Sequence, residues 1–242
     1  MTSTTIMPGG GISKRPLHFF ILADCSGSMR GEKIQALNYA IADMLPHLVA
    51  WEHEQEQARV FVRVISFANE PVWHIANPVP VDELRWKPLR YVERGRTNMG
   101  AAFRMLAEAL APGNIERRAL RPSILLITDG QPTDPVGGFE AGLNELLSQP
   151  SGRTALRLAI AIGRQANSEA LNRFISDPNV PVLVADSTEQ ILERLVAASL
   201  AASRMSEAGV DRDAVANRLL GYSQESSAAP DGSGESEEGS IV

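Results

Sequence analysis

Short runs of hydrophobic residues alternate along the chain with longer segments in which hydrophobic residues recur every three or four positions. The runs occupy residues 18–23, 60–67, 123–128, 155–162 and 180–184, with a shorter one at 72–76 between Pro71 and Pro78. Nearly unbroken apolar runs of this length are typical of strands buried on both faces of a sheet. A strand bounded by proline favours a sheet edge, because proline donates no backbone hydrogen bond. The pattern therefore predicts six strands, with the one at 72–76 at an edge.

Five segments show the spacing of amphipathic helices. They are residues 32–51, 99–110, 139–147, 168–175 and about 188–207. Pro46 lies inside the first of them, where a proline is expected to kink or interrupt the helix. Alternating strands and helices predict an α/β fold, doubly wound, with a mostly parallel six-stranded sheet. Helices should cover both faces, and the short edge strand should be antiparallel.

The two ends of the chain differ in composition from the middle. Residues 1–15 are rich in Ser, Thr and Gly, and we expect a flexible segment there. Residues 16–208 carry the strand and helix pattern of a domain. Residues 209–222 are expected to form a short helical extension, whose Val215, Leu219 and Leu220 could pack on the domain or serve a partner. Residues 223–242 contain almost no large hydrophobic side chain, which is typical of disorder.

The formal net charge of −6 lies mostly in that tail. Residues 223–242 contain no Lys or Arg and hold Glu225, Asp231, Glu235, Glu237 and Glu238. The rest of the chain is therefore close to neutral, which argues against a nucleic-acid partner, because phosphate binding needs a concentrated basic face.

No apolar run approaches the roughly 18 residues of a membrane-spanning helix, and the N-terminus lacks the apolar stretch of a secretion signal. The single cysteine, Cys25, excludes an internal disulfide and a cysteine-rich zinc site, and we expect it to pack in the core. These features predict a cytoplasmic protein with no membrane partner.

Oxygen-bearing side chains follow the predicted strands. Asp24, Ser26 and Ser28 come directly after the first strand, Asp129 follows the strand at 123–128, and Thr97 precedes the helix at 99–110. Because ligands of such sheets bind at the carboxyl ends of the strands, we expect these five side chains at one edge. Five oxygens suit a hard cation, Mg²⁺ most naturally, with Mn²⁺ or Ca²⁺ also possible. Zinc would require histidine or cysteine.

The segments that carry these residues resemble the metal-ion-dependent adhesion site (MIDAS) of von Willebrand factor A (VWA) domains. These segments are ILADCSGSMRGEKIQALN, RVISFAN, GRTNMGAAF and LLITDGQPTD. Within the VWA domains, they are most similar to the bacterial TerY-like group, which is associated with tellurium resistance and stress response. The segment LERLVAASLAASRMS also resembles the last helix of that group. The resemblance covers about residues 16–208. It implies that Ser26, Ser28 and Thr97 touch the metal and that the two aspartates often act through water. It also implies an open coordination position for a Glu or Asp of a partner protein. Some TerY relatives carry a cysteine-rich metal domain at the C-terminus, where this chain has an acidic tail.

Three functions follow from these residues. The first is a non-enzymatic, metal-dependent binding module or scaffold; the TerY-like resemblance implies a Ser/Thr kinase or a PPM-type phosphatase as its partner. The second is a metal-dependent phosphotransfer or hydrolase enzyme of the haloacid-dehalogenase type. That chemistry needs a second aspartate where Ser26 stands, and the site loops contain no histidine to act as a base. The third is a structural domain with a vestigial motif, which the complete set of five oxygens disfavours.

Residues beside the motif have simpler explanations. Arg30, Arg94 and Arg96 border the expected site and could attract an acidic partner, although loop arginines are usually just solvated. Asp134 is expected to be a turn residue near the rim of the site.

Overall fold

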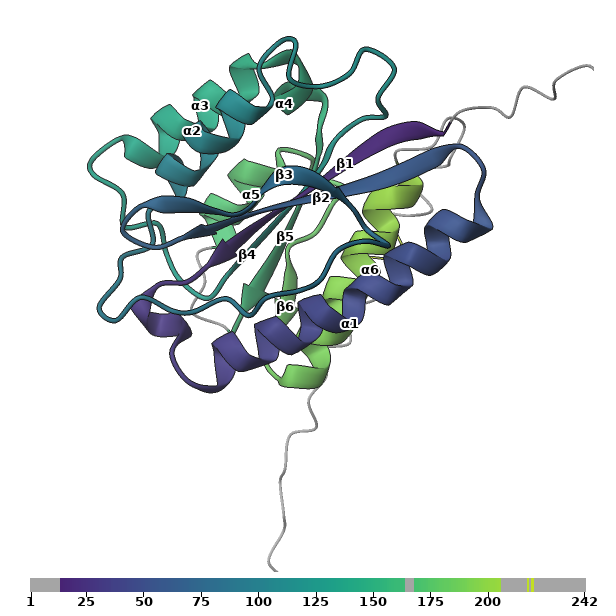
Figure 1. Cartoon of the computed structure of the whole chain (residues 1–242). Coiled ribbons are helices and arrows are strands. Elements are labelled where there is room, and N and C mark those ends of the chain that lie inside the picture. Colours follow the sequence, from purple (N-terminus) through teal and green to yellow (C-terminus); the bar gives the residue numbers. More distant parts are fainter. Residues whose placement is uncertain (1–13, 164–167, 206–216, 218, 220–242) are drawn as a thin grey trace, which may run out of the picture.

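Six strands form one sheet in the order β3-β2-β1-β4-β5-β6 (Figure 1). The strands are β1 (Arg15–Asp24), β2 (Ala58–Phe67), β3 (Pro71–Pro80), β4 (Ser123–Thr128), β5 (Leu156–Ile162) and β6 (Leu183–Ala185). The computed structural model describes residues 14–163, 168–205, 217 and 219. All neighbouring strands pair in parallel except β2 and β3, which are antiparallel. The predicted α/β fold with one antiparallel edge pair is therefore confirmed.

Burial follows the position of each strand in the sheet. Every residue of β4 and β5 is buried, and so is all of β1 after Arg15. In β2 buried residues mostly alternate with half-buried ones, and β3 contains no fully buried residue. This gradient is expected for a sheet whose centre is covered on both faces and whose β3 edge is covered least.

Helices cover the two faces of the sheet in separate groups. They are α1 (Glu32–Glu54), α2 (Met99–Ala109), α3 (Gly138–Ser148), α4 (Pro150–Thr154), α5 (Ser168–Ile175) and α6 (Thr188–Met205), with a single 3-10 turn, η1, at Gly27–Met29. The long helices α1 and α6 lie side by side on one face, and α2 and α3 lie together on the other (Figure 1). The ring of Phe103 in α2 stacks on that of Phe174 in α5, with centroids 5.2 Å apart, so α5 belongs to the second group.

Helix α1 continues through Pro46, so the expected interruption is wrong. A proline inside a helix removes one backbone hydrogen bond and costs about 3 kcal/mol. Leu45, Leu48 and Trp51 are buried on the same helix, and each such side chain contributes about 1.5–3 kcal/mol when it leaves water. Tertiary packing on both sides of Pro46 thus offsets the loss.

Three further details differ from the sequence-based expectation. Strand β3 extends to Pro80 instead of ending near residue 76, because its pairing with β2 resumes beyond an irregularity between Val62 and Ile65. Strand β6 has only three residues. Helix α4 was not expected, since five residues are too few to show a helical period.

The C-terminal extension contributes at least one residue to the core. Leu219 is 1% exposed and belongs to the buried hydrophobic core. For this residue, the structure agrees with the expectation that the extension packs on the domain rather than serving a partner. Val215 and Leu220 lie outside the described residues, as do the expected flexible start and the expected acidic disordered tail.

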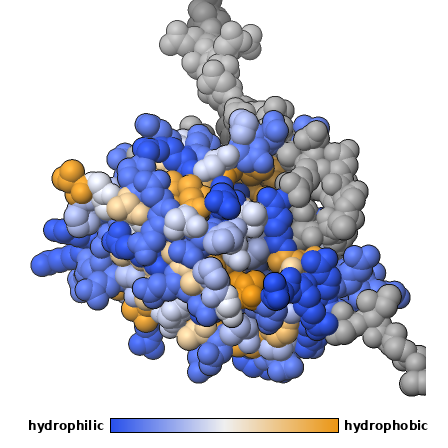
Figure 2. Space-filling model, turned by 90° about the horizontal axis from the view of Figure 1, so that it is seen from above, coloured by the Kyte–Doolittle hydropathy of each residue, from blue (hydrophilic) through white to orange (hydrophobic). Residues whose placement is uncertain are grey.

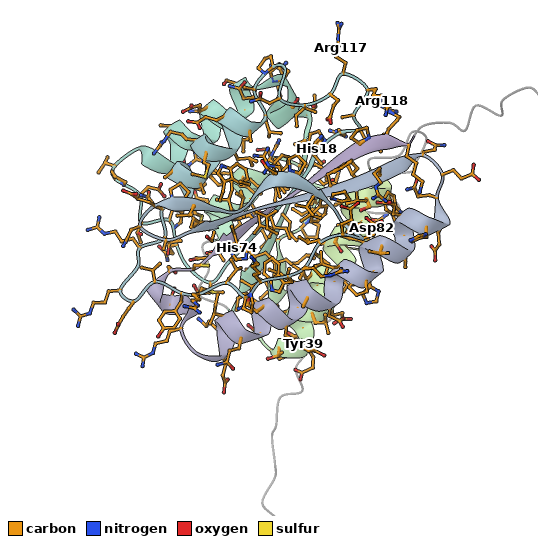
Figure 3. All side chains as sticks on the ribbon, viewed as in Figure 1. His18, Tyr39, His74, Asp82, Arg117 and Arg118 are labelled. Atoms are coloured by element: carbon orange, nitrogen blue, oxygen red, sulfur yellow. The ribbon has the colours of Figure 1, made fainter. Side chains whose placement is uncertain are left out.

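The surface of the described part of the molecule is largely hydrophilic. In the view from above, hydrophobic residues lie in small groups separated by hydrophilic ones (Figure 2). The exposed large hydrophobic residues of the described part are Tyr39, Val72, Val92 and Val136. Tyr39 lies on the solvent-facing side of α1 and points away from the helix (Figure 3). No helix within the described residues combines the length and hydrophobicity needed to cross a membrane.

The strand order reverses between β1 and β4. From β1 the chain passes through α1 to β2 on one side, and from β3 it passes through α2 to β4 on the other. In open α/β sheets a crevice forms at such a switch point, beyond the carboxyl ends of the strands. Asp24 ends β1 and Asp129 follows β4, so the fold brings these two aspartates to that position.

Candidate metal centre

The Asp24 carboxylate is held at both of its oxygens. Its Oδ1 accepts a hydrogen bond from the backbone N–H of Ser26 at 2.7 Å, which closes the turn after β1. Its Oδ2 accepts a hydrogen bond from the Thr128 hydroxyl at 2.5 Å, which ties the end of β1 to the end of β4. Asp24 is fully buried, and these two bonds fix the direction in which it faces.

The site is built from three loops: the first follows β1, the second precedes α2 and the third follows β4. A chain of short contacts joins the first loop to the third. The Oγ atoms of Ser26 and Ser28 lie 3.0 Å apart, on either side of the turn that begins η1. The Ser28 hydroxyl then donates to Oδ1 of Asp129 at 2.7 Å. The other oxygen of Asp129, Oδ2, lies 2.5 Å from Nζ of Lys33, in the first turn of α1. Four oxygen-bearing residues of the motif therefore lie within one small region.

Thr97 reaches this region through the loop before α2. The loop runs beside Gly27, where an added Cβ would lie 3.2 Å from the backbone nitrogen of Arg94. Glycine therefore lets the two loops approach closely, and Gly27 N–H donates to the Gly95 carbonyl at 3.0 Å. A Cβ placed on Gly130 would lie 3.4 Å from Oγ1 of Thr97 and 3.9 Å from Oγ of Ser28. The structure thus brings together all five residues expected from the sequence.

The loop after β4 holds Thr97 and the start of α2. Thr97 N–H donates to the Thr133 hydroxyl at 2.7 Å, and Thr133 N–H donates to the Thr97 carbonyl at 2.9 Å. Asp134 Oδ1 accepts the Gly100 N–H at 2.7 Å, in the first turn of α2. Asp134, expected as a turn residue near the rim, therefore also satisfies helix N–H groups that have no partner within the helix.

The charges in the centre favour a cation. Burial raises the pKa of Asp24 to about 6, against the hydrogen bonds from Thr128 and Ser26, and the negative charge of Asp129 raises it further. Two carboxylates held this close repel each other, so a positive ion between them would stabilise both. The hydroxyl and carboxylate oxygens fit a hard divalent ion. Within the described residues no group of three or more His, Cys, Asp and Glu side chains is arranged to hold a metal, so a histidine- or cysteine-based site is absent there.

The cysteine and the histidines stay outside this chemistry. Cys25 is 2% exposed, and burial raises the pKa of its thiol to about 12, which confirms a small core residue. His18 lies in β1, far along the strand from Asp24, with its Nε2 2.6 Å from a Glu116 carboxylate oxygen (Figure 3). His74 Nε2 lies 2.7 Å from the Lys87 carbonyl oxygen.

Sequence reasoning missed three residues that shape the centre: Lys33, Thr128 and Thr133. Thr128 carried a weak signal, as a hydroxyl at the end of an apolar strand next to Asp129. Lys33 and Thr133 carried none, because their roles depend on how α1 and the third loop lie against the site. Arg30, Arg94 and Arg96 are exposed around the centre and form no ion pair with any described residue.

Comparison with known proteins identifies the family of the chain. The family model described as "von Willebrand factor type A domain" matches residues 19–198, three quarters of the chain. No curated protein sequence matches the chain.

Several solved structures share the fold. The von Willebrand factor type A protein from Catenulispora acidiphila is 14% identical with a TM-score of 0.57, over 85% of this chain and 43% of that one. The ArnB paralog VWA2 from Sulfolobus acidocaldarius is 18% identical with a TM-score of 0.55, over 76% of this chain and 45% of that one. Proximal thread matrix protein 1 from the mussel byssus, described with zinc occupying its MIDAS motif, is 15% identical with a TM-score of 0.57, over 77% of this chain and 48% of that one. The expectation that zinc requires histidine or cysteine is therefore wrong for a site of this kind.

The chain thus spans a little under half of the length of these structures. At such identities the likeness shows the fold alone, whereas the family match rests on the sequence of 19–198. The chain belongs to the von Willebrand factor type A family, whose members are generally non-enzymatic interaction modules that often carry a MIDAS metal site.

Proposed function

We propose that Asp24, Ser26, Ser28, Thr97 and Asp129 form a MIDAS that binds a divalent cation, and that the protein is a non-enzymatic, metal-dependent protein-binding module. The observation that carries the proposal is the continuous contact from Ser26 through Ser28 to Asp129, with the Thr97 hydroxyl beside Gly130. Oxygens from three separate loops converge there, which an ordinary strand-to-helix turn does not require.

The donor set leads to the proposed mode of partner binding. In the family arrangement the three neutral hydroxyls touch the ion directly and the two aspartates often act through water, so the ion would keep a coordination position for an incoming carboxylate. Arg30, Arg94 and Arg96 add positive charge around this position and would favour an acidic partner by long-range attraction. Val92 and Val136, two exposed hydrophobic residues on the loops next to the site, would supply apolar contact.

Mg²⁺ is the proposed ion, with Mn²⁺ or Ca²⁺ as substitutes, because hydroxyl and carboxylate oxygens are hard ligands. The proposed partner is a protein that supplies an Asp or Glu, and the TerY-like segments point to a Ser/Thr kinase or PPM-type phosphatase in a bacterial stress response. A cytoplasmic location is part of the same proposal.

An enzyme of the haloacid-dehalogenase type is the alternative. It would need a carboxylic acid two residues after Asp24, and that position is Ser26, whose Oγ lies 3.0 Å from Oγ of Ser28. The two residues that a phosphatase would use as nucleophile and acid are therefore not both present. The family assignment also favours the binding module.

Titration calorimetry with Mn²⁺ tests the metal site. We expect weak binding to the isolated protein, because no partner carboxylate completes the coordination, and loss of that binding in the double variant Asp24→Ala with Ser26→Ala. The matched control is Asp82→Ala with Ser148→Ala, which removes an aspartate and a serine that make no contact with the candidate site and should bind like the natural sequence. Unchanged binding in the site variant would overturn the assignment.

Capture from a host lysate tests the module. Immobilised protein in Mg²⁺ should retain a partner that is released by EDTA and absent when the Asp24→Ala and Ser26→Ala variant is used. A metal-dependent hydrolysis of phosphate esters that disappears in Asp24→Asn would instead favour the enzyme.

A further inference from the structure

A lysine places a positive charge inside the candidate metal centre. Nζ of Lys33 lies 2.5 Å from Oδ2 of Asp129. The Asp129 side chain is 0% exposed, whereas that of Lys33 is 41% exposed, so the stem of the lysine reaches in from solvent while the carboxylate stays buried. Since the Ser28 hydroxyl donates to Oδ1, both oxygens of Asp129 are already bound.

The position of Lys33 in its helix makes this contact notable. Lys33 is the second residue of α1, and the positive end of the helix dipole disfavours a cation there. A solvent-exposed lysine would normally turn its ammonium group outward. Lys33 instead directs it to a buried carboxylate, so the attraction to Asp129 outweighs both tendencies.

The charge of the centre follows from its members. Asp24 and Asp129 contribute two negative charges and Lys33 one positive charge, and no other side chain forms an ion pair with either aspartate among the described residues. Without Lys33 a divalent ion would bring the group to neutrality. With Lys33 the group that holds the ion keeps an excess of one positive charge.

We propose that Lys33 sets the charge of this centre, so that it weakens binding of the divalent ion and strengthens capture of a carboxylate by the ion-loaded site. This inference rests on the proposed MIDAS function. If Lys33 merely anchored α1 to the third loop, its replacement would loosen the site and lower both affinities. The proposal requires that the two affinities change in opposite directions.

Three variants separate these possibilities. Lys33→Met keeps the apolar stem and removes the charge, and Lys33→Arg keeps the charge. Lys87→Met is the matched control, because Lys87 is also exposed and its side chain forms no ion pair or hydrogen bond to a described residue. Circular dichroism first establishes that each variant is folded.

Two measurements use the full chain with Mn²⁺ and acetate as probes. Calorimetry should show Mn²⁺ binding tighter in Lys33→Met by a factor on the order of ten, as expected for one nearby unit charge in a partly buried site. Paramagnetic broadening of the acetate resonance by the Mn²⁺-loaded protein should show acetate bound several-fold more weakly in the same variant. Lys33→Arg and Lys87→Met should resemble the natural sequence in both measurements.

The outcomes distinguish this inference from the proposal on which it rests. Mn²⁺ affinity that is unchanged or lowered in Lys33→Met, or an equal gain in Lys87→Met, overturns the role of Lys33 while the metal site stands. Tighter Mn²⁺ binding without weaker acetate binding also overturns it. Mn²⁺ binding that persists in the variant with Asp24→Ala and Ser26→Ala instead overturns the metal site itself.

Discussion

At the residue scale, the centre depends on side chains that never appear in its motif. The Thr128 hydroxyl donates to Oδ2 of the buried Asp24 carboxylate at 2.5 Å and accepts the Gly130 N–H at 3.2 Å. One hydroxyl therefore both orients the first aspartate and shapes the backbone after the second. A buried carboxylate that loses such a donor becomes less favourable in its charged form.

This arrangement predicts the effect of Thr128→Val, which preserves the shape of the side chain and removes the hydroxyl. We expect the free energy of unfolding at pH 7 to fall by about 1–3 kcal/mol, because a buried charged group loses its hydrogen bond. Urea denaturation measures the change. Thr128→Ser keeps the hydroxyl and should lie closer to the natural sequence, and a Thr128→Val protein as stable as its parent would contradict the assigned role.

The five oxygen-bearing residues could be predicted because each stands at a position that the strand pattern defines. Asp24 and Asp129 follow apolar runs, and Thr97 precedes a helix. Once the strands are recognised, the parallel sheet brings these positions together. Lys33 and Thr133 could not be predicted in the same way. Lys33 contacts Asp129 and Thr133 contacts Thr97, and both partners are distant in sequence, so the residues around Lys33 and Thr133 give no sign of these contacts.

At the element scale, glycines set how closely α2 and α3 approach. A Cβ on Gly142 in α3 would lie 2.1 Å from the Gly100 carbonyl oxygen in α2, and one on Gly100 would lie 2.2 Å from the Gly138 carbonyl oxygen. The two backbones are therefore in direct contact. Since α2 begins just after Thr97, this packing also affects where the Thr97 hydroxyl lies.

Gly142→Ala distinguishes packing from helix propensity. Propensity alone predicts a gain of about 1 kcal/mol when alanine replaces glycine inside a helix. The contact with Gly100 predicts a loss, since overpacking typically costs about 1–3 kcal/mol. Set against the gain from propensity, this gives a net loss of up to about 2 kcal/mol in urea denaturation. Ala141→Gly, at an exposed position of the same helix, should show the propensity effect without the clash. A Gly142→Ala protein more stable than its parent would disprove the close contact.

Periodicity predicted most elements, and it failed where local preference and tertiary packing disagree. Pro46 locally disfavours a helix, yet α1 continues because its buried face is long enough to offset one lost hydrogen bond. The short α4 and the extra length of β3 depend on neighbours rather than on any repeat in their own sequence.

At the scale of the whole molecule, the boundaries of the domain stay a prediction. The family match covers residues 19–198, whereas the expected domain covers 16–208 and the expected extension 209–222. Leu219 bears on this boundary, because a residue 1% exposed and in contact with the core belongs physically to the folded unit. We therefore predict that the folded unit includes Leu219, beyond the last residue of α6, and that it ends before the acidic stretch of 223–242.

Two changes near the C-terminus should differ in their effect on the free energy of unfolding. Leu219→Ala removes a buried side chain and leaves a cavity, so we expect the free energy of unfolding to fall by about 2–5 kcal/mol. Deletion of 223–242 removes five like charges and almost no hydrophobic surface, so the change should stay within about 0.5 kcal/mol, as for a surface substitution. Urea denaturation of both proteins at one ionic strength makes the comparison, because repulsion within an acidic tail varies with salt. A loss of more than about 1 kcal/mol on deletion would mean that the tail packs on the domain, and a neutral Leu219→Ala would contradict the packing of Leu219 in the core.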